Sequence, residues 1–187
     1  YDTPKFGFGT LDAAGDGAPL RAFVADFFAG TLKRTLKSQP APLAPWAGPG
    51  APLTVVGKTI EELVVKAEED VLLCFHQPYN FDANNATLRR LARLLAPASG
   101  ARVALMDAYA NEFDAATFPG VERYQMISEL MAWSGAGAAR TMKRFKGKPT
   151  LKTLLPFVKK HLPSVRAAWA EVKATLDADN ARVAEEK

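Results

Sequence analysis

The order of elements along this 187-residue chain predicts an α/β three-layer sandwich with a mixed sheet. Short apolar runs alternate with amphipathic helical stretches between residues 53 and 107, a pattern typical of strands that are joined by helices. Two more apolar runs flank a glycine-rich turn at residues 134–138, which predicts a hairpin in the same sheet. The expected elements are strand 53–56, helix 59–67, strand 70–76, helix 83–96, strand 101–107, helix or turn 111–118, strands 125–133 and 140–146, and helix 150–161.

The first 37 residues predict a strand and a helix that are separate from this sandwich. Residues 6–8 alternate like the end of a strand. Apolar residues spaced three and four apart then predict a helix that stops near Gly30, namely Leu20, Phe23, Val24, Phe27 and Phe28. A helix with three phenylalanines on one side has to bury them against something. Only a short strand accompanies this helix, so we expect either that the rest of a folded unit lies upstream or that the helix docks elsewhere.

Residues 38–52 contain five prolines in fifteen positions, which predicts an extended, semi-rigid linker. Trp46 lies within it, and two interpretations of this residue stay open. It docks on the neighbouring domain of the same chain, or it caps a ligand site.

A second amphipathic stretch follows the sandwich at residues 164–187. Pro163 predicts the end of the preceding helix, and Ser164 a cap for the next one. The apolar stripe consists of Val165, Ala168, Trp169, Val172, Leu176 and Val183. This helix either packs back on its own domain or binds a partner through residues 164–186.

Residues 71–83, with the sequence VLLCFHQPYNFDA, resemble a known family most closely. They align without a gap on the hydrophobic strand, aromatic-Ala-Pro-Trp and C-G-H-C of the protein disulfide isomerase family, in its catalytic domain nearest the C-terminus. Shorter matches at 55–60, 103–112 and 147–160 occur in the family's order. The resemblance implies a thioredoxin-like domain over residues 53–163, and it makes residues 1–37 similar to the last strand and helix of the domain before it.

The resemblance places degenerate residues at every catalytic position. Asn80 and Ala83 occupy the two cysteine positions, and Cys74 stands where catalytic members carry a buried acid. Residues 120–125 resemble the family's Gly-Val-x-x-Tyr-Pro, so Gln125 replaces the cis-proline. A cis bond before a non-proline residue costs about 2.5–4 kcal/mol, and we expect the peptide before Gln125 to be trans.

Thiol–disulfide exchange needs one thiolate to attack and a second thiol to resolve the mixed disulfide. The chain contains one cysteine, Cys74, in an apolar run. Burial among apolar side chains raises a thiol pKa, so we expect an inert core residue; a reactive thiol, or one that pairs with another chain, is the alternative. We therefore expect no dithiol enzyme activity from this chain.

What the resemblance leaves is a surface for binding polypeptide. Disulfide isomerases hold unfolded chains around the mouth of the active site, and this function does not require thiols. The candidate residues are Tyr79, Phe81, Tyr124 and Gln125, together with Trp46. Phe81 replaces a small glycine of the family's motif, and it either contacts client polypeptide or folds against Tyr79.

The sequence gives little support for a metal site, a dinucleotide site or a membrane helix. His76 and His161 are the only histidines, and neither has a second ligand at metal spacing. Gly135 and Gly137 lack the third glycine of a dinucleotide fingerprint. No apolar run approaches the roughly 18–20 residues of a membrane helix. We expect no metal, no cofactor and no membrane insertion; a glycosylation sequon at Asn85 falls inside a predicted helix.

Residues 140–160 hold eight basic residues and no acidic one. The net charge is only +4, and no nucleic-acid motif accompanies the block, so we expect no nucleic-acid partner. A solvated basic face is the favoured interpretation, and an acidic protein or a glycan is the alternative partner.

Together these features predict a redox-inactive, protein-binding module that acts as a chaperone or adaptor. Two alternatives stay open. The chain is a fragment of a larger disulfide isomerase with an active C-x-x-C domain upstream, or it is a structural subunit held in an assembly by its terminal helices. The resemblance alone implies the lumen of the endoplasmic reticulum.

Overall fold

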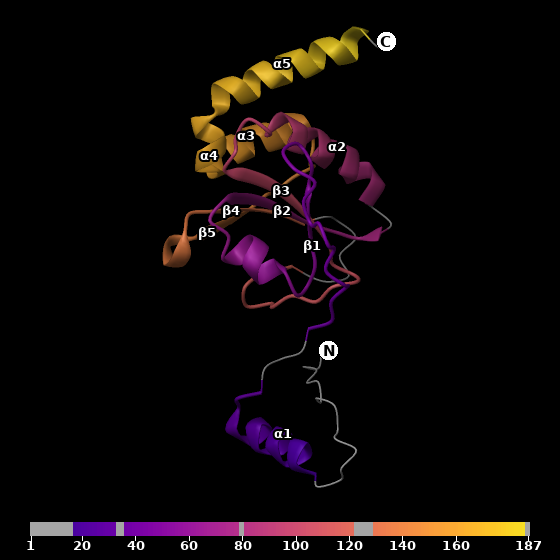
Figure 1. Ribbon diagram of the computed structural model, residues 1–187. Coiled ribbons are helices and arrows are strands. Elements are labelled where there is room, and N and C mark those ends of the chain that lie inside the picture. Colours follow the sequence, from indigo (N-terminus) through magenta and orange to yellow (C-terminus); the bar gives the residue numbers. More distant parts are fainter. Residues whose placement is uncertain (1–16, 33–35, 79–80, 122–128, 186–187) are drawn as a thin grey trace. The chain divides into compact units, whose positions relative to one another are not determined.

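The structure is a computed structural model that describes residues 17–32, 36–78, 81–121 and 129–185 (Figure 1). The chain divides into two compact units, residues 1–37 and residues 38–187, and each is described by itself. The first unit contains α1 (Ala18–Ala29). The second contains β1 (Leu53–Val55), η1 (Glu61–Val65), β2 (Asp70–His76), α2 (Phe81–Leu94), β3 (Ala101–Asp107), β4 (Glu129–Ser134), η3 (Gly137–Ala139), β5 (Thr141–Arg144), α3 (Leu151–His161), α4 (Pro163–Ala167) and α5 (Trp169–Glu185).

The strands of the second unit form one five-stranded mixed sheet with the order β1-β3-β2-β4-β5. β1 and β2 both pair with β3 in parallel, whereas β4 is antiparallel to β2 and to β5. The predicted α/β fold with a mixed sheet is therefore confirmed. β2 and β3 occupy the predicted residues, and their long apolar runs lie in the middle of the sheet, where a strand is buried on both faces.

Each face of the sheet has its own core (Figure 1). α2, α3 and α4 cover one face, where the leucines expected from the helix pattern, Leu88, Leu91, Leu94 and Leu95, are all buried. η1 and the segment after β3 cover the other face. There Phe75 of β2 packs against Phe113 and Phe118, with ring centroids 4.7 and 5.3 Å apart. Helices on both faces complete the three layers.

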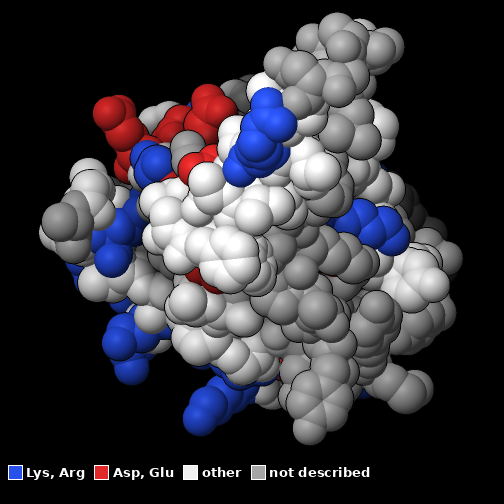
Figure 2. Space-filling model, turned by 90° about the horizontal axis from the view of Figure 1, so that it is seen from below, with Lys and Arg blue, Asp and Glu red and all other residues white. Residues whose placement is uncertain are grey.

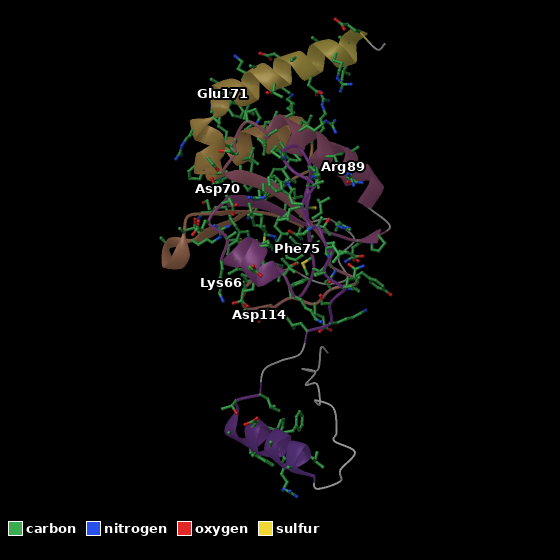
Figure 3. All side chains as sticks on the ribbon, in the orientation of Figure 1. Lys66, Asp70, Phe75, Arg89, Asp114 and Glu171 are labelled. Atoms are coloured by element: carbon green, nitrogen blue, oxygen red, sulfur yellow. The ribbon has the colours of Figure 1, made fainter. Side chains whose placement is uncertain are left out.

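The helix expected at residues 59–67 is shorter and wider than predicted. The Thr59 hydroxyl accepts a hydrogen bond at 3.1 Å from the amide of Val56, three residues before it. The turn that follows, η1, is a π-helix, and the Lys66 amide closes it by donating to the Glu61 carbonyl at 2.8 Å. At residues 111–118 the structure contains a single turn, in which Asp114 accepts from the amides of Ala116 and Thr117 (Figure 3).

The C-terminal stretch forms two helices in place of the single expected helix, with a break at Ala168 between α4 and α5. The predicted apolar stripe faces the core, because Val165 and Val172 are fully buried and Trp169 and Leu176 pack against the same cluster. Farther along α5, Asp179 accepts from Arg90 of α2 at 2.5 Å. This stretch thus packs on its own unit.

Ser164 does not cap a helix, contrary to prediction. Its hydroxyl donates to a carboxylate oxygen of Asp70 and to the Gly100 carbonyl, and its amide donates to the same oxygen of Asp70 at 2.8 Å. Asp70 begins β2 and lies under α4 (Figure 3). The serine therefore ties the helical extension to the sheet.

The first unit shows a helix with much of its apolar side exposed. α1 ends at Gly30, as predicted, with the glycine in the left-handed region at φ 67°. Phe28 is 82% exposed and Phe27 is 54% exposed. The strand expected at residues 6–8 lies outside the described residues. Among the described helices of both units, none has the length and apolar character needed to span a lipid bilayer.

Candidate functional site

The candidate site lies at the end of the sheet where β2 and β3 finish and α2 begins (Figure 1). Phe81 is the first residue of α2, and Ala83 lies in its first turn. The side chains of both fall outside what the structure describes, and so do Tyr79, Asn80, Tyr124 and Gln125 entirely. The grouping of these residues at one mouth, and the conformation of the peptide before Gln125, stay predictions.

Cys74 lies deep in the sheet. Its side chain has no exposed surface, and its neighbours across the strands are Leu105 of β3 and Leu130 of β4, which are also buried. The thiol donates to the Phe75 carbonyl at 3.7 Å. A thiol in these apolar surroundings is disfavoured as thiolate, which is the nucleophilic form.

His76 ends β2 at the same end of the sheet and pairs in register with Asp107, the last residue of β3. Burial lowers the pKa of His76, while the negative charge of Asp107 and a hydrogen bond with the Gln77 backbone oppose this shift. Asp107 also accepts from the amides of Tyr109 and Ala110, at 2.8 and 3.1 Å. The loop after β3 is therefore held in a fixed turn.

That turn exposes an aromatic residue that sequence analysis missed. Tyr109 is 54% exposed and follows β3 by two residues, at the end of the sheet where α2 starts. The sequence signal that could have identified this residue is an aromatic side chain two positions after Asp107, where β3 ends. Tyr109 adds described apolar surface to this end of the molecule.

Asn111, also missed as a site residue, holds the linker against this end of the sheet. Its side chain is fully buried and makes four hydrogen bonds. The Oδ1 atom accepts from the amides of Gln39 and Gly57 at 2.9 and 3.0 Å, and Nδ2 donates to the Gln39 side chain and the Asp107 carbonyl at 2.9 and 3.0 Å. The start of the proline-rich segment is thus fixed to the domain.

Trp46 lies at the opposite end of the sheet, away from the start of α2. The indole N–H donates to the Ala51 carbonyl at 3.0 Å, and the Arg102 guanidinium lies 4.0 Å from the ring centre. Arg102 belongs to the start of β3 and pairs with Glu69. A cavity of about 150 Å³ lies beside the indole, between the linker and the last turn of α2. Trp46 therefore docks on its own unit, beside the start of β3.

Charged residues are distributed unevenly among the described residues, and Figure 2 shows acidic side chains gathered in one part of that view. Two arginines of the basic stretch 140–160 make specific contacts with the protein. Arg140 donates to three backbone carbonyls, those of Val64, Glu69 and Gly135, at 2.6–2.9 Å. Arg144 pairs with Glu129 at 2.6 Å. These two arginines hold the β4–β5 hairpin to its surroundings, which sequence analysis did not predict.

The described residues contain no group of three or more histidine, cysteine or acidic side chains that could hold a metal ion. The expectation of no metal and no cofactor concerns the whole chain and stays a prediction. What the described part of the site offers is aromatic surface, a buried thiol and a fixed turn.

Comparison with known proteins found relatives over most of the chain, although no family model matches it. Protein disulfide-isomerase A3 of Gallus gallus is 27% identical over 165 residues, which cover 85% of this chain and 30% of the relative. Protein disulfide-isomerase A4 of Homo sapiens is 30% identical over 150 residues, 78% of this chain and 22% of the relative. The same protein of Mus musculus is 41% identical over 64 residues, 34% of this chain and 10% of the relative.

The chain thus spans less than a third of the length of these relatives. The similarity to two of them extends over most of the chain, and the five-stranded mixed sheet has the predicted architecture. The chain therefore belongs to the protein disulfide-isomerase family and carries one of its thioredoxin-like domains.

Proposed function

We propose that this chain is a redox-inactive module of the disulfide-isomerase family that binds polypeptide, as a chaperone or an adaptor in protein folding. One observation carries the proposal: the sole cysteine of the chain is buried inside the sheet, so the start of α2 has no thiol. Attack and resolution both require a thiol that can reach a disulfide, and a side chain with no exposed surface cannot supply one.

Binding does not depend on that chemistry. The end of the sheet that carries the start of α2 also presents Tyr109, which is half-exposed. Aromatic side chains bury much apolar area, and this supports contact with the apolar segments that an unfolded chain exposes. Phe81 and Tyr79 are the proposed neighbouring contacts, on the strength of the family resemblance. The lumen of the endoplasmic reticulum is the proposed location on the same ground.

Reduction of insulin by dithiothreitol tests the redox part of the proposal. The chain should not accelerate precipitation of the insulin B chain above the rate without protein. A Cys74→Ala variant should behave in the same way, because the thiol takes no part. Turnover by the unmodified chain that the variant loses would refute the assignment as redox-inactive.

Suppression of aggregation of a chemically denatured client tests the binding part. Phe81→Gly and Tyr109→Ala should each reduce suppression. Leu43→Ala is the control, since Leu43 is an exposed apolar residue that lies on the linker. Equal suppression by all four proteins would refute a binding surface at the start of α2.

A second candidate is that the chain is the non-catalytic part of a longer disulfide isomerase. The observation that favours it is the short span of the match, at most 30% of the relatives' length. Sequencing the full reading frame tests this candidate directly. An upstream Cys-x-x-Cys motif would assign the enzyme activity to another domain of the protein, and its absence would leave the adaptor role.

A further inference from the structure

β5 and α3 together form a surface in which aromatic and basic side chains alternate. Phe145, just after β5, packs against Phe157 of α3, with ring centroids 5.2 Å apart at an angle of 73°. Phe157 in turn lies 4.8 Å from the ring of His161, at the end of α3. All three side chains are partly buried, so part of each remains accessible to solvent. They form a continuous strip along the helix.

Two lysines border this strip from different elements. Lys143 is exposed on β5, and Lys160 is exposed in the last turn of α3. Burial lowers the pKa of His161 first, and the positive charges of Lys160 and Lys143 lower it further. Both ammonium groups therefore act on the same ring. We call these five residues the basic strip: Lys143, Phe145, Phe157, Lys160 and His161.

The fold itself accounts for only part of this charge. Lys160 stabilises the carbonyl end of α3, because cations are favoured at the C-terminus of a helix. Lys143 belongs to β5 and has no such role. Residues 140–160 contain no acid, and within the described residues no carboxylate pairs with Lys143 or Lys160. The positive charge of the basic strip is thus left for solvent or for a partner.

We propose that the basic strip binds an acidic segment of a partner polypeptide. Carboxylates on such a segment would reach the two ammonium groups, while its aliphatic carbons would cover the accessible parts of the rings. Nucleic acid fits less well, because Phe145 and Phe157 also pack against the hydrophobic core and the net charge of the chain is only +4. The proposal does not depend on the absence of thiols at the start of α2.

Fluorescence anisotropy with a labelled peptide of about ten glutamates tests the proposal on the full chain. The peptide should bind at low salt and lose affinity as salt rises, because exposed ion pairs are screened. The double variant Lys143→Gln, Lys160→Gln should weaken binding by roughly two- to thirtyfold, given about 0.2–1 kcal/mol for each of the two exposed pairs. Both positions are exposed, so the double variant should stay folded, with only the small loss of stability that follows from removing a cation at the C-terminus of α3.

A matched double variant, Lys58→Gln with Lys173→Gln, removes the same charge from exposed positions outside the basic strip. It should change the affinity less than twofold. Equal losses in the two double variants would show that net charge alone attracts the peptide and would overturn the proposal. Tighter binding of a single-stranded oligothymidylate of equal charge, or no binding of the peptide at low salt, would overturn it as well.

Discussion

Replacing Asn111 by alanine should destabilise the domain more than the loss of any other single polar side chain in the described part of the candidate site. The amide group satisfies two backbone N–H donors and one backbone carbonyl, from the linker, the turn after β1 and the end of β3. Among the described residues, Asn111 is the one whose hydrogen bonds join these three segments. Alanine would remove all of these hydrogen bonds and leave the two amides and the carbonyl without this partner.

The magnitude follows from where those partners lie. Gly57 is buried, and leaving its amide without an acceptor costs about 1–3 kcal/mol. Gln39 is exposed, so water can replace most of the hydrogen bonds that its groups lose. The bond to the Asp107 carbonyl adds about 1 kcal/mol. We expect a total loss of about 2–4 kcal/mol in the free energy of unfolding, out of the roughly 5–15 kcal/mol typical of a domain.

Urea unfolding followed by tryptophan fluorescence measures this loss. The control is Gln39→Ala, which removes one exposed side-chain partner of Asn111 and keeps the backbone donor. It should cost less than about 1 kcal/mol. Limited proteolysis should also cut Asn111→Ala within residues 38–52 sooner than the unmodified chain. A loss below 1 kcal/mol for Asn111→Ala, or the same loss for both variants, would refute the reasoning.

Three further predictions concern other parts of the second unit. A thiol reagent should not label Cys74 in the native protein and should label it after unfolding; rapid native labelling would contradict its burial. The free energy of unfolding should fall as pH drops through 6.5, because the unfolded chain takes up a proton at its ordinary pKa whereas His76 in the fold has a lowered one. His76→Phe should reduce the slope and leave the part contributed by His161, whose pKa is also lowered. An unchanged slope would show that His76 does not contribute to it. Asp179→Ala should lower the free energy of unfolding by about 0.5–1 kcal/mol, because it removes the ion pair with Arg90. Amide hydrogen exchange should rise only in the second half of α5, since Val172 still anchors the first half. An equal rise along the whole of α5 would show that the ion pair does not fix the second half of the helix.

The sheet could be predicted from the sequence because its signals are local. β2 and β3 are runs of apolar residues long enough to stand out, and burial on both faces demands such runs. η1 was predicted with the wrong geometry. Hydrophobic periodicity assumes 3.6 residues per turn, whereas Leu63, Val64 and Val65 are consecutive apolar residues, two of them β-branched, and fit a wider turn equally well.

The connections between distant segments could not be predicted. Ser164 looked like a helix cap because it follows a proline, but Asp70, 94 residues earlier, is its partner. Arg140 looked like one more solvated cation in a basic block, yet it binds carbonyls near residues 64 and 69. No spacing rule reports contacts over such separations, because only the packed sheet brings these segments together.

At the candidate site, the missing dithiol could be predicted from the sequence alone. The absence of a second cysteine is a property of the sequence, and the burial of Cys74 agrees with the apolar run that contains it. An ionised acid at the position of Cys74, with Leu105 and Leu130 on either side, would be a charge in apolar surroundings without a partner. Such a group costs several kcal/mol and is retained only where function requires it. The neutral thiol of Cys74 avoids this cost, and its burial among apolar neighbours agrees with the redox-inactive role that we propose.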